Sequence, residues 1–386
     1  MQHLKLFFIV CFGFALQIAA CHESVIQPGA NNTNQYFSLL VGKRIALVGN
    51  HTSLLGKVHL LDTLLKSGVD IKKVFCPEHG FRGNIEAGER VKTQKDPASG
   101  IKIISLYGKN YKPKAADLLD VDVVLFDIQD IGVRCYTYLS TLHYVMEACA
   151  ENGKKLIVLD RPNPNASYVA GPTLNLKYKS FVGLHPIPLV YGMTIGEYAL
   201  MLNGEGWLKN GVKADITVVP CSNYSHSSRV ELTEKPSPNI PNTQAVYLYP
   251  SLVLFEGTCI NVGRGTDFPF QVFGSPLISE NNFSYTPRTK TGNLAPMHAD
   301  TMCYGLNLKD FAFPDSNRFS IQWLLYAYNH FPQKKVFFNK FFYNLAGNAE
   351  LIQQIKQGLG ALEIQQSWKA DIDSFLLIRK KYLLYE

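Results

Sequence analysis

The sequence lacks the short signatures of several large enzyme classes. No G-x-G-x-x-G follows the first apolar segment, where "VGNHTSLLG" has the wrong spacing, so a dinucleotide site is disfavoured. No G-x-x-x-x-G-K-[ST] loop and no G-x-S-x-G elbow occur, which argues against P-loop and serine-hydrolase chemistry. The chain also has no C-x-x-C pair and no H-E-x-x-H motif, the usual marks of thioredoxin-like and zinc sites.

Charge is sparse as well. Only 18% of the 386 residues are charged, and the formal net charge of +7 comes from scattered basic residues. This is not the clustered positive charge of a nucleic-acid-binding protein, so no nucleic-acid partner is expected. Beyond the N-terminus, no apolar run is long enough to cross a bilayer. A membrane contact would therefore need an anchor of another kind.

The first twenty residues have the pattern of a secretion signal. Lys5 precedes the apolar segment "LFFIVCFGFAL", which is too short to span a membrane. The following Ile18-Ala19-Ala20-Cys21 resembles a bacterial lipobox, which implies cleavage before Cys21 and lipid attachment to its thiol. We expect residues 21–36 to form a polar, lipidated tether. The alternative is a plain signal peptide followed by a chance cysteine.

Apolar strand patterns alternate with helical patterns from Arg44 to about Pro220. Continuous Val/Ile/Leu segments such as "RIALVG" and "KLIVL" indicate buried parallel strands covered by helices on both faces. We therefore predict a doubly wound α/β domain over residues 37–235. A proline-rich stretch follows, and residues 240–386 predict a smaller α+β domain, with a ligand cleft between the two.

Polar side chains stand where the predicted strands stop. The carboxyl ends of parallel strands meet at one edge of a sheet, where ligands bind. The residues in these positions are His51, Glu78, His79, Asp127, Gln129, Asp130, Asp160, Arg161 and Asn163. Paired carboxyl groups favour glycoside hydrolysis, in which one carboxyl protonates the leaving oxygen and the other activates water or attacks the sugar. A metal site built from His51, His79, Glu78 and Asp127 remains an alternative.

A second candidate segment, "LFEGTCINVGRGTDFPF", covers residues 254–270. Arg264 lies between two glycines, so its backbone can approach a ligand closely. One interpretation is a bulged hairpin in which Arg264 pairs with Glu256 or Asp267. The other is a loop that faces the cleft and closes over it.

Several motifs in order resemble one known family. They are "CPEHGFRG", "DIQDIGVRCYTY", "LDRPNP", "YGMTIGE", "PSPNIP", "YPSL" and "FEGT" with "VGRGTD", and they extend from about Gly42 to the C-terminus. Together they resemble the exo-β-N-acetylmuramidase family (NamZ). The resemblance implies a Rossmann-like N-terminal domain and release of terminal, non-reducing N-acetylmuramic acid from peptidoglycan. It also implies a periplasmic enzyme of cell-wall recycling, which the lipobox would tether to a bacterial membrane, the outer one by preference. The expected partners are MurNAc-GlcNAc oligosaccharides, and no cofactor is expected.

The residues and the resemblance agree best at Glu78. We expect Glu78 to be the general acid and rank Glu256, Glu89 and Asp127, in that order, as the second carboxylate. Attack by the acetamido group of the sugar would remove the need for it, and Asp127 or Asp130 could then orient that group. Arg82 and Arg264 are our first choices for reading the lactyl carboxylate; Arg134 and Arg161 are candidates that could instead brace turns. The predicted substrate-binding set is His51, His79, Arg82, Glu89, Asp127, Gln129, Arg134, Asn163 and Arg264. A metal-dependent hydrolase and a non-catalytic muropeptide-binding lipoprotein are the rival readings.

Overall fold

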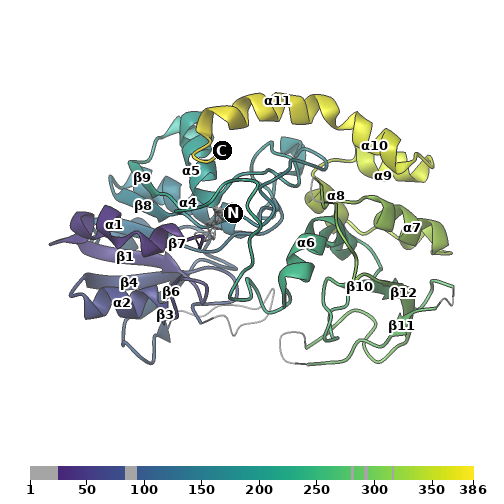
Figure 1. Ribbon diagram of the computed structural model, residues 1–386, viewed down its shortest axis with the longest axis horizontal. Helices are drawn as coiled ribbons and strands as arrows, with labels where there is room; N and C mark the ends of the chain where they lie inside the picture. The colour runs from purple at the N-terminus through teal and green to yellow at the C-terminus, as the bar shows by residue number, and fades with distance from the viewer. Residues whose placement is uncertain (1–24, 83–93, 280–281, 291–293, 315–316) are drawn as a thin grey trace, which may run out of the picture.

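The chain folds into two lobes in the computed structural model (Figure 1). The structure describes residues 25–82, 94–279, 282–290, 294–314 and 317–386. Signal residues 1–20, Cys21 and Glu89 lie outside these ranges. None of the helices in the described ranges has the length and apolar character to cross a membrane.

The first lobe is built on a seven-stranded sheet with the order β5-β6-β4-β1-β7-β8-β9. All neighbouring strands are parallel except the short edge pair β5–β6. The strands are β1 (Arg44–Gly49), β4 (Asp70–Cys76), β5 (Gln94–Lys95), β6 (Lys102–Ser105), β7 (Val123–Asp127), β8 (Lys155–Leu159) and β9 (Ile216–Val219). The central strands are almost wholly buried, as their unbroken apolar sequences predicted. The doubly wound α/β fold is confirmed.

Helices cover both faces of this sheet. They are α1 (Thr33–Leu40), α2 (Leu60–Lys66), α3 (Ala115–Leu118), α4 (Tyr138–Glu151) and α5 (Ile195–Gly204), with η2 (Leu176–Tyr178), η3 (Lys209–Gly211) and a small hairpin of β2 (Leu54–Leu55) and β3 (Val58–His59). The start of α5 follows from its sequence, because Thr194 accepts a hydrogen bond from the Glu197 amide while the Glu197 carboxylate accepts one from the Thr194 amide.

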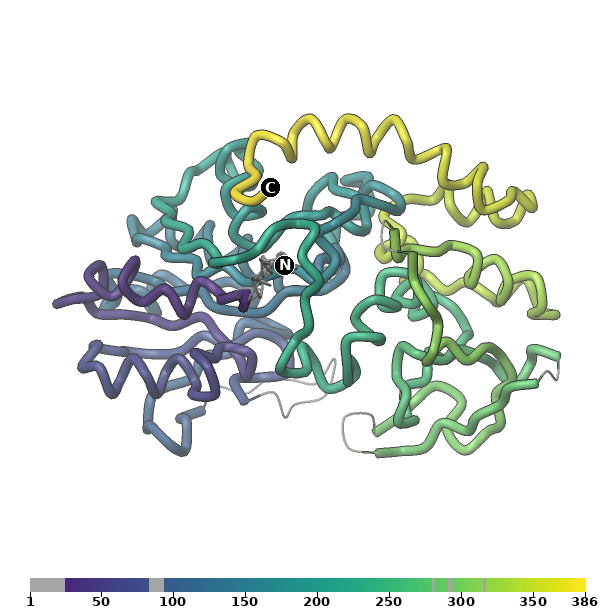
Figure 2. The backbone as a smooth tube through the Cα atoms, viewed as in Figure 1, coloured from purple at the N-terminus to yellow at the C-terminus, as the bar shows by residue number. Residues whose placement is uncertain are grey.

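The second lobe combines a small sheet with helices. Its elements are α6 (Thr243–Leu252), η4 (Val253–Gly257), β10 (Val272–Ser275), β11 (Ser284–Tyr285), β12 (Cys303–Asn307), α7 (Gln322–His330), η5 (Lys334–Val336), α8 (Phe341–Ala346), α9 (Glu350–Lys356), α10 (Ala361–Ser367), α11 (Lys369–Arg379) and η6 (Lys380–Tyr382). Helix α11 runs back across the top of the molecule to the first lobe, as the yellow end of the tube in Figure 2 shows. There the Tyr385 hydroxyl donates to Asp160 at 2.6 Å.

The N-terminal segment departs from the expected tether. We expected residues 21–36 to form a polar tether. Instead, the described part of this segment forms η1 (Gly29–Asn31) and the start of α1 against the sheet. Tyr36 and Ala30 are fully buried, and the Tyr36 hydroxyl donates to the Ala30 carbonyl. Gly29 packs so tightly that a Cβ atom there would lie 2.1 Å from the Val219 carbonyl oxygen. The first lobe therefore begins before residue 37.

Candidate active site

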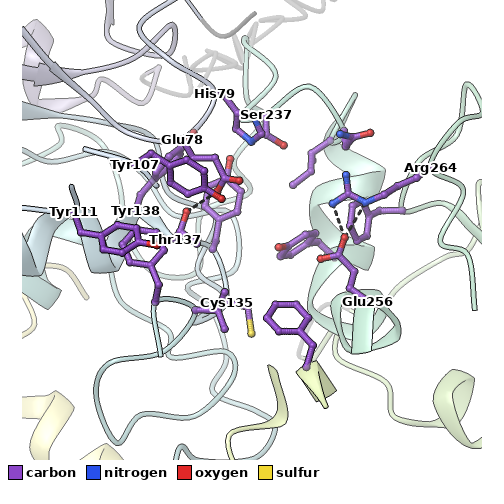
Figure 3. A pocket seen from close by; sticks show the side chains of 18 residues that line it. Glu78, His79, Tyr107, Tyr111, Cys135, Thr137, Tyr138, Ser237, Glu256 and Arg264 are labelled. Atoms are coloured by element: carbon purple, nitrogen blue, oxygen red, sulfur yellow. Dashed lines mark hydrogen bonds and ion pairs between the residues drawn. The ribbon is translucent and has the colours of Figure 1, made fainter. Parts of the chain in front are cut away.

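A cavity of about 570 Å³ opens where the two lobes meet. Its first-lobe wall includes Glu78, His79, Tyr107, Tyr111, Cys135, Thr137, Tyr138 and Phe181, and its second-lobe wall includes Tyr249, Glu256, Arg264, Phe270 and Phe341. Ser237 and Asn239 of the proline-rich connection complete it. Figure 3 shows Glu78 on one side and Glu256 with Arg264 on the other. The predicted cleft between two domains is therefore present.

The Glu78 turn owes its shape to the residues that follow the carboxylate. Strand β4 ends at Cys76, and the backbone then turns through His79 at φ +67° and Gly80 at φ +74°. A left-handed conformation suits glycine but is uncommon for histidine. Such local strain is typical of functional sites. The turn directs Glu78 into the cavity while His79 becomes buried.

Two hydroxyl groups contact the Glu78 carboxylate. Thr137, the residue before α4, donates from its Oγ1 to Glu78 Oε2 at 3.1 Å. Tyr107, which follows β6, also hydrogen-bonds to Glu78. Burial, and then the charge of Glu78, raise the pKa of Tyr107, so this phenol stays a neutral donor at physiological pH. The carboxylate is thus held by one side chain that follows a neighbouring strand and by one that precedes a helix.

The facing wall carries an ion pair. Arg264 Nε and Nη2 both donate to Oε1 of Glu256, at 2.8 and 2.5 Å. Burial alone would lower the pKa of Arg264, but the charge of Glu256 and its hydrogen bond raise it. Gly263 and Gly265, at φ +77° and +83°, give this loop a path that a Cβ atom would obstruct. Arg264 pairs with Glu256, as the first interpretation expected, although this segment begins in η4 and forms no strand of a hairpin. Arg264 also lines the cavity, as the second interpretation expected.

Aromatic rings form part of the first-lobe wall. Tyr111 and Phe181 stack with centroids 4.1 Å apart and an interplanar angle of 27°. Tyr107 lies beside them, with its centroid 6.0 Å from that of Phe181. Stacked ring faces of this kind suit the apolar face of a sugar. Sequence reasoning missed these residues, although Tyr107 also follows a strand end and the same strand-end rule could have found it.

Comparisons with known proteins agree with this geometry. The family model for the N-terminal domain of the exo-β-N-acetylmuramidase NamZ matches residues 45–244, and that for its C-terminal domain matches residues 247–385. The chain belongs to this family. It is 36% identical over 381 residues to the peptidoglycan β-N-acetylmuramidase NamZ of Bacillus subtilis (strain 168), covering 91% of this chain and 89% of that protein.

Solved structures match the whole of this NamZ-family fold. A DUF1343 family protein of Bacteroides fragilis NCTC 9343 is 44% identical, with a TM-score of 0.88 over 94% of this chain and 99% of that one. A second protein of the same description and organism is 29% identical, with a TM-score of 0.80 over the same shares of the two chains. Both lobes therefore belong to one conserved architecture.

Other residues that we predicted for the site of this NamZ-family chain do not line the cavity. They make hydrogen bonds and ion pairs that stabilise the fold. Arg82 makes two hydrogen bonds to Asp96, from Nε at 3.1 Å and Nη2 at 3.0 Å. Asp127 is fully buried and pairs with Arg161, with Nε and Nη2 at 2.5 and 2.8 Å from its two oxygens. Arg134 is 2% exposed and donates to the carbonyls of Pro172, Ile187, Leu345 and Ala346. Arg134 and Arg161 thus brace the fold, as one of our alternatives allowed.

Three more predicted residues have polar partners of their own. Gln129 donates to the Asp130 and Pro162 carbonyls, and Asn163 donates to the Met193 carbonyl. His51 contacts the Lys235 carbonyl through Nε2 at 2.7 Å, and burial lowers the pKa of this imidazole. His51 lies near His79 but does not line the cavity. These residues shape the edge of the sheet from which Glu78 projects.

The donor set does not favour the metal alternative. Within the described ranges, no group of three or more His, Cys, Asp or Glu side chains is placed to hold a metal ion. Glu78 and Glu256 instead stand on opposite walls, each with hydrogen-bond donors beside it. This is the layout expected for acid–base work on a ligand lying between them.

Proposed function

We propose that this chain hydrolyses the glycosidic bond of a terminal, non-reducing, β-linked N-acetylmuramic acid in peptidoglycan fragments. The observation that supports this best is the pair of carboxylates, Glu78 and Glu256, facing each other across one cavity in a chain of the NamZ family. The substrate is carried over from the family and from the B. subtilis relative. A cavity of about 570 Å³ falls within the usual size range of small-ligand sites.

Glu78 acts in this proposal as the general acid. It gives its proton to the glycosidic oxygen as the bond from that oxygen to the anomeric carbon breaks. Thr137 and Tyr107 fix the carboxyl group in place through their hydrogen bonds. Glu256 is the second carboxylate and takes a proton from the attacking water, whose oxygen ends on the anomeric carbon.

Arg264 is proposed to read the lactyl carboxylate of the substrate. Its Nε and Nη2 are engaged by Glu256, while no described residue hydrogen-bonds to Nη1. A guanidinium nitrogen that faces the cavity is a suitable donor to a carboxylate. This contact would separate muramic acid from N-acetylglucosamine, which has no lactyl group. The stacked rings of Tyr111 and Phe181 are proposed to support the leaving sugar.

The direct test compares two chromogenic substrates. The chain from His22 onward is assayed with para-nitrophenyl β-N-acetylmuramide and with the corresponding glucosaminide, with and without a chelator. We expect chelator-insensitive release from the muramide only. Glu78→Gln and Glu256→Gln should each lower kcat by at least about 100-fold. Glu205→Gln, whose carboxylate pairs with Lys381 and Tyr382 outside the cavity, should keep the wild-type kcat.

Each rival reading has its own result in that assay. Loss of activity with chelator and recovery with added metal would support a metal-dependent hydrolase. Binding of the muramide without turnover by wild type would support a muropeptide-binding protein. Full activity of Glu78→Gln would remove Glu78 from the mechanism.

We further propose that the protein is exported and tethered to a bacterial membrane by a lipid on Cys21. The support is the N-terminal sequence, with its short apolar segment and lipobox-like residues. Mass analysis of the mature N-terminus should find an acylated Cys21 and no residues 1–20. Cys21→Ser should yield protein that fractionates with the soluble periplasm, and membrane retention of that variant would contradict the anchor.

A further inference from the structure

A second cavity of about 600 Å³ is as large as the candidate active site. Like the active site, it is formed by segments of both lobes, with Ser227 and Arg229 from the first and Tyr247, Phe311 and Arg318 from the second. Clefts between domains are common places for ligands. We call it the α6 cavity, because Tyr247 of helix α6 forms part of its wall.

Helix α6 separates the α6 cavity from the active site. Tyr249 lines the active site and Tyr247 lines the α6 cavity. Residues that are two positions apart on an α-helix point in directions about 200° apart around its axis, so these two rings lie on opposite faces of α6. Helix α6 lies where the second lobe faces the first (Figure 1). The two cavities are therefore distinct sites that share one helix.

Three aromatic side chains line the α6 cavity, those of Tyr247, Phe311 and Phe313. The Arg318 guanidinium lies 3.9 Å from the centroid of the Tyr247 ring. Phe313 packs edge-on against Tyr247, and Phe311 packs edge-on against Phe313, with centroids 6.0 and 5.2 Å apart. Phe311 is 41% exposed, so its ring is the part of this lining that a ligand could cover.

The charge of the α6 cavity is positive. Arg318 donates from Nη1 to the Pro164 carbonyl at 2.9 Å, and no carboxylate among the described residues lies within ion-pair distance of it. Arg229 pairs with Glu231 at 3.9 Å in open solvent, where such pairs contribute little. The described residues that line the cavity include no Asp or Glu. Two guanidinium groups beside aromatic rings favour an anionic ligand with a ring.

We propose that the α6 cavity is a second, non-catalytic binding site for a muramic-acid-containing glycan. The sugar ring would lie against Phe311, and the lactyl carboxylate would pair with Arg318 and Arg229. The choice of ligand rests on the proposed function, since the substrate of that reaction carries both a pyranose ring and a carboxylate. Such a site would hold a glycan strand near the enzyme while its terminal sugar occupies the active site.

A non-substrate disaccharide separates the two sites. GlcNAc-β-MurNAc carries the wrong non-reducing sugar for the proposed cleavage, and chitobiose is its neutral counterpart. In isothermal titration of the chain from His22 onward, we expect GlcNAc-MurNAc to bind about tenfold or more tightly than chitobiose. Arg318→Gln should abolish the difference, and Phe311→Ala should weaken binding of both disaccharides. The control Arg288→Gln, an exposed arginine elsewhere in the second lobe that does not line this cavity, should bind as wild type does.

The outcomes distinguish this proposal from the proposed function. Arg318→Gln should hydrolyse para-nitrophenyl muramide at the wild-type rate, and thermal unfolding should show that each variant is folded at the assay temperature. Equal affinity for the two disaccharides in wild type would overturn the second site. So would loss of GlcNAc-MurNAc binding in Arg264→Gln with retention in Arg318→Gln, because the ligand would then lie in the active site. Absence of muramide hydrolysis would refute the enzyme activity without altering the binding result.

Discussion

A substitution at Asp127 tests whether this carboxylate stabilises the fold or takes part in the reaction. The sequence places it at a strand end beside Glu78 and makes it a candidate for the second carboxylate, yet its side chain is fully buried against Arg161. Asp127→Asn keeps the shape but removes the charge and turns an amide NH2 toward a guanidinium donor. Breaking a buried ion pair by changing one partner costs about 3–5 kcal/mol, because the other charge is left uncompensated.

The expected result is a large loss of stability with the chemistry unchanged. Urea unfolding of Asp127→Asn should show a free energy of unfolding lower by about 3–5 kcal/mol. At a temperature where the variant is folded, kcat and KM for the chromogenic muramide should stay within about twofold of wild type, because Asp127 does not line the cavity. The exposed variant Asp267→Asn, which loses only a pair with Lys290, is the control for a charge change. A stable variant with a large loss of kcat would refute this assignment and return Asp127 to the mechanism.

Three further predictions follow from individual contacts. Arg134→Met should lower the free energy of unfolding by about 3 kcal/mol or more, because it removes two hydrogen bonds within the first lobe and two to the second lobe, and leaves their carbonyls buried; proteolysis that stays as slow as in wild type would contradict this. Tyr111→Ala should raise KM for MurNAc-GlcNAc about fivefold through loss of its stacked ring, with kcat little changed, and an unaltered KM would exclude the platform. Burial raises the pKa of Asp130 from 3.8 to about 7, so the folded chain holds a proton that the unfolded chain releases, and stability should fall by up to about 4 kcal/mol as the pH rises from 4 to 7. Urea unfolding across that range should give a flatter profile for Asp130→Asn, and an identical slope in both proteins would count against Asp130 as the cause.

Much of the fold could be predicted from the sequence, because strands, helix starts and turns depend on residues that are close together in the chain. Unbroken apolar segments predicted the parallel strands, and the capping pair of Thr194 and Glu197 that starts α5 is likewise only three residues apart. The Glu78 turn and the Gly–Arg–Gly loop were found for the same reason, since glycines next to charged residues mark special backbone at those positions.

Pairings between distant segments were not accessible in the same way. The residues around Arg82 in the sequence do not predict that Asp96 accepts both of its hydrogen bonds. Likewise, the residues around Asp127 do not predict its ion pair with Arg161. The polar composition of "QPGANNTNQ" likewise predicted a tether, whereas Gly29 and Tyr36 let this segment pack on the sheet. In each case the deciding contact joins residues whose positions only the folded chain brings together.

The topology explains why only part of the strand-end cluster reaches the cavity. The direction of winding reverses between β1 and β7, and ligands of doubly wound sheets usually bind outside that point. Here that place is a hollow of only about 270 Å³, lined by Thr52, Gln129 and Arg161 and closed by residues of the N-terminal segment, such as Gln27 and Asn31.

The N-terminal segment therefore takes the space that a bound nucleotide occupies in other sheets of this kind. The polar residues after β1, β7 and β8 become braces for that closure, whereas those after β4 and β6 remain open to the second lobe. The active site is displaced along the sheet edge toward Glu78 and Tyr107, where Glu256 and Arg264 can approach from the facing lobe. Strand-end position alone thus selects too many residues, and the side of the sheet that the second lobe faces separates the catalytic candidates from the structural ones.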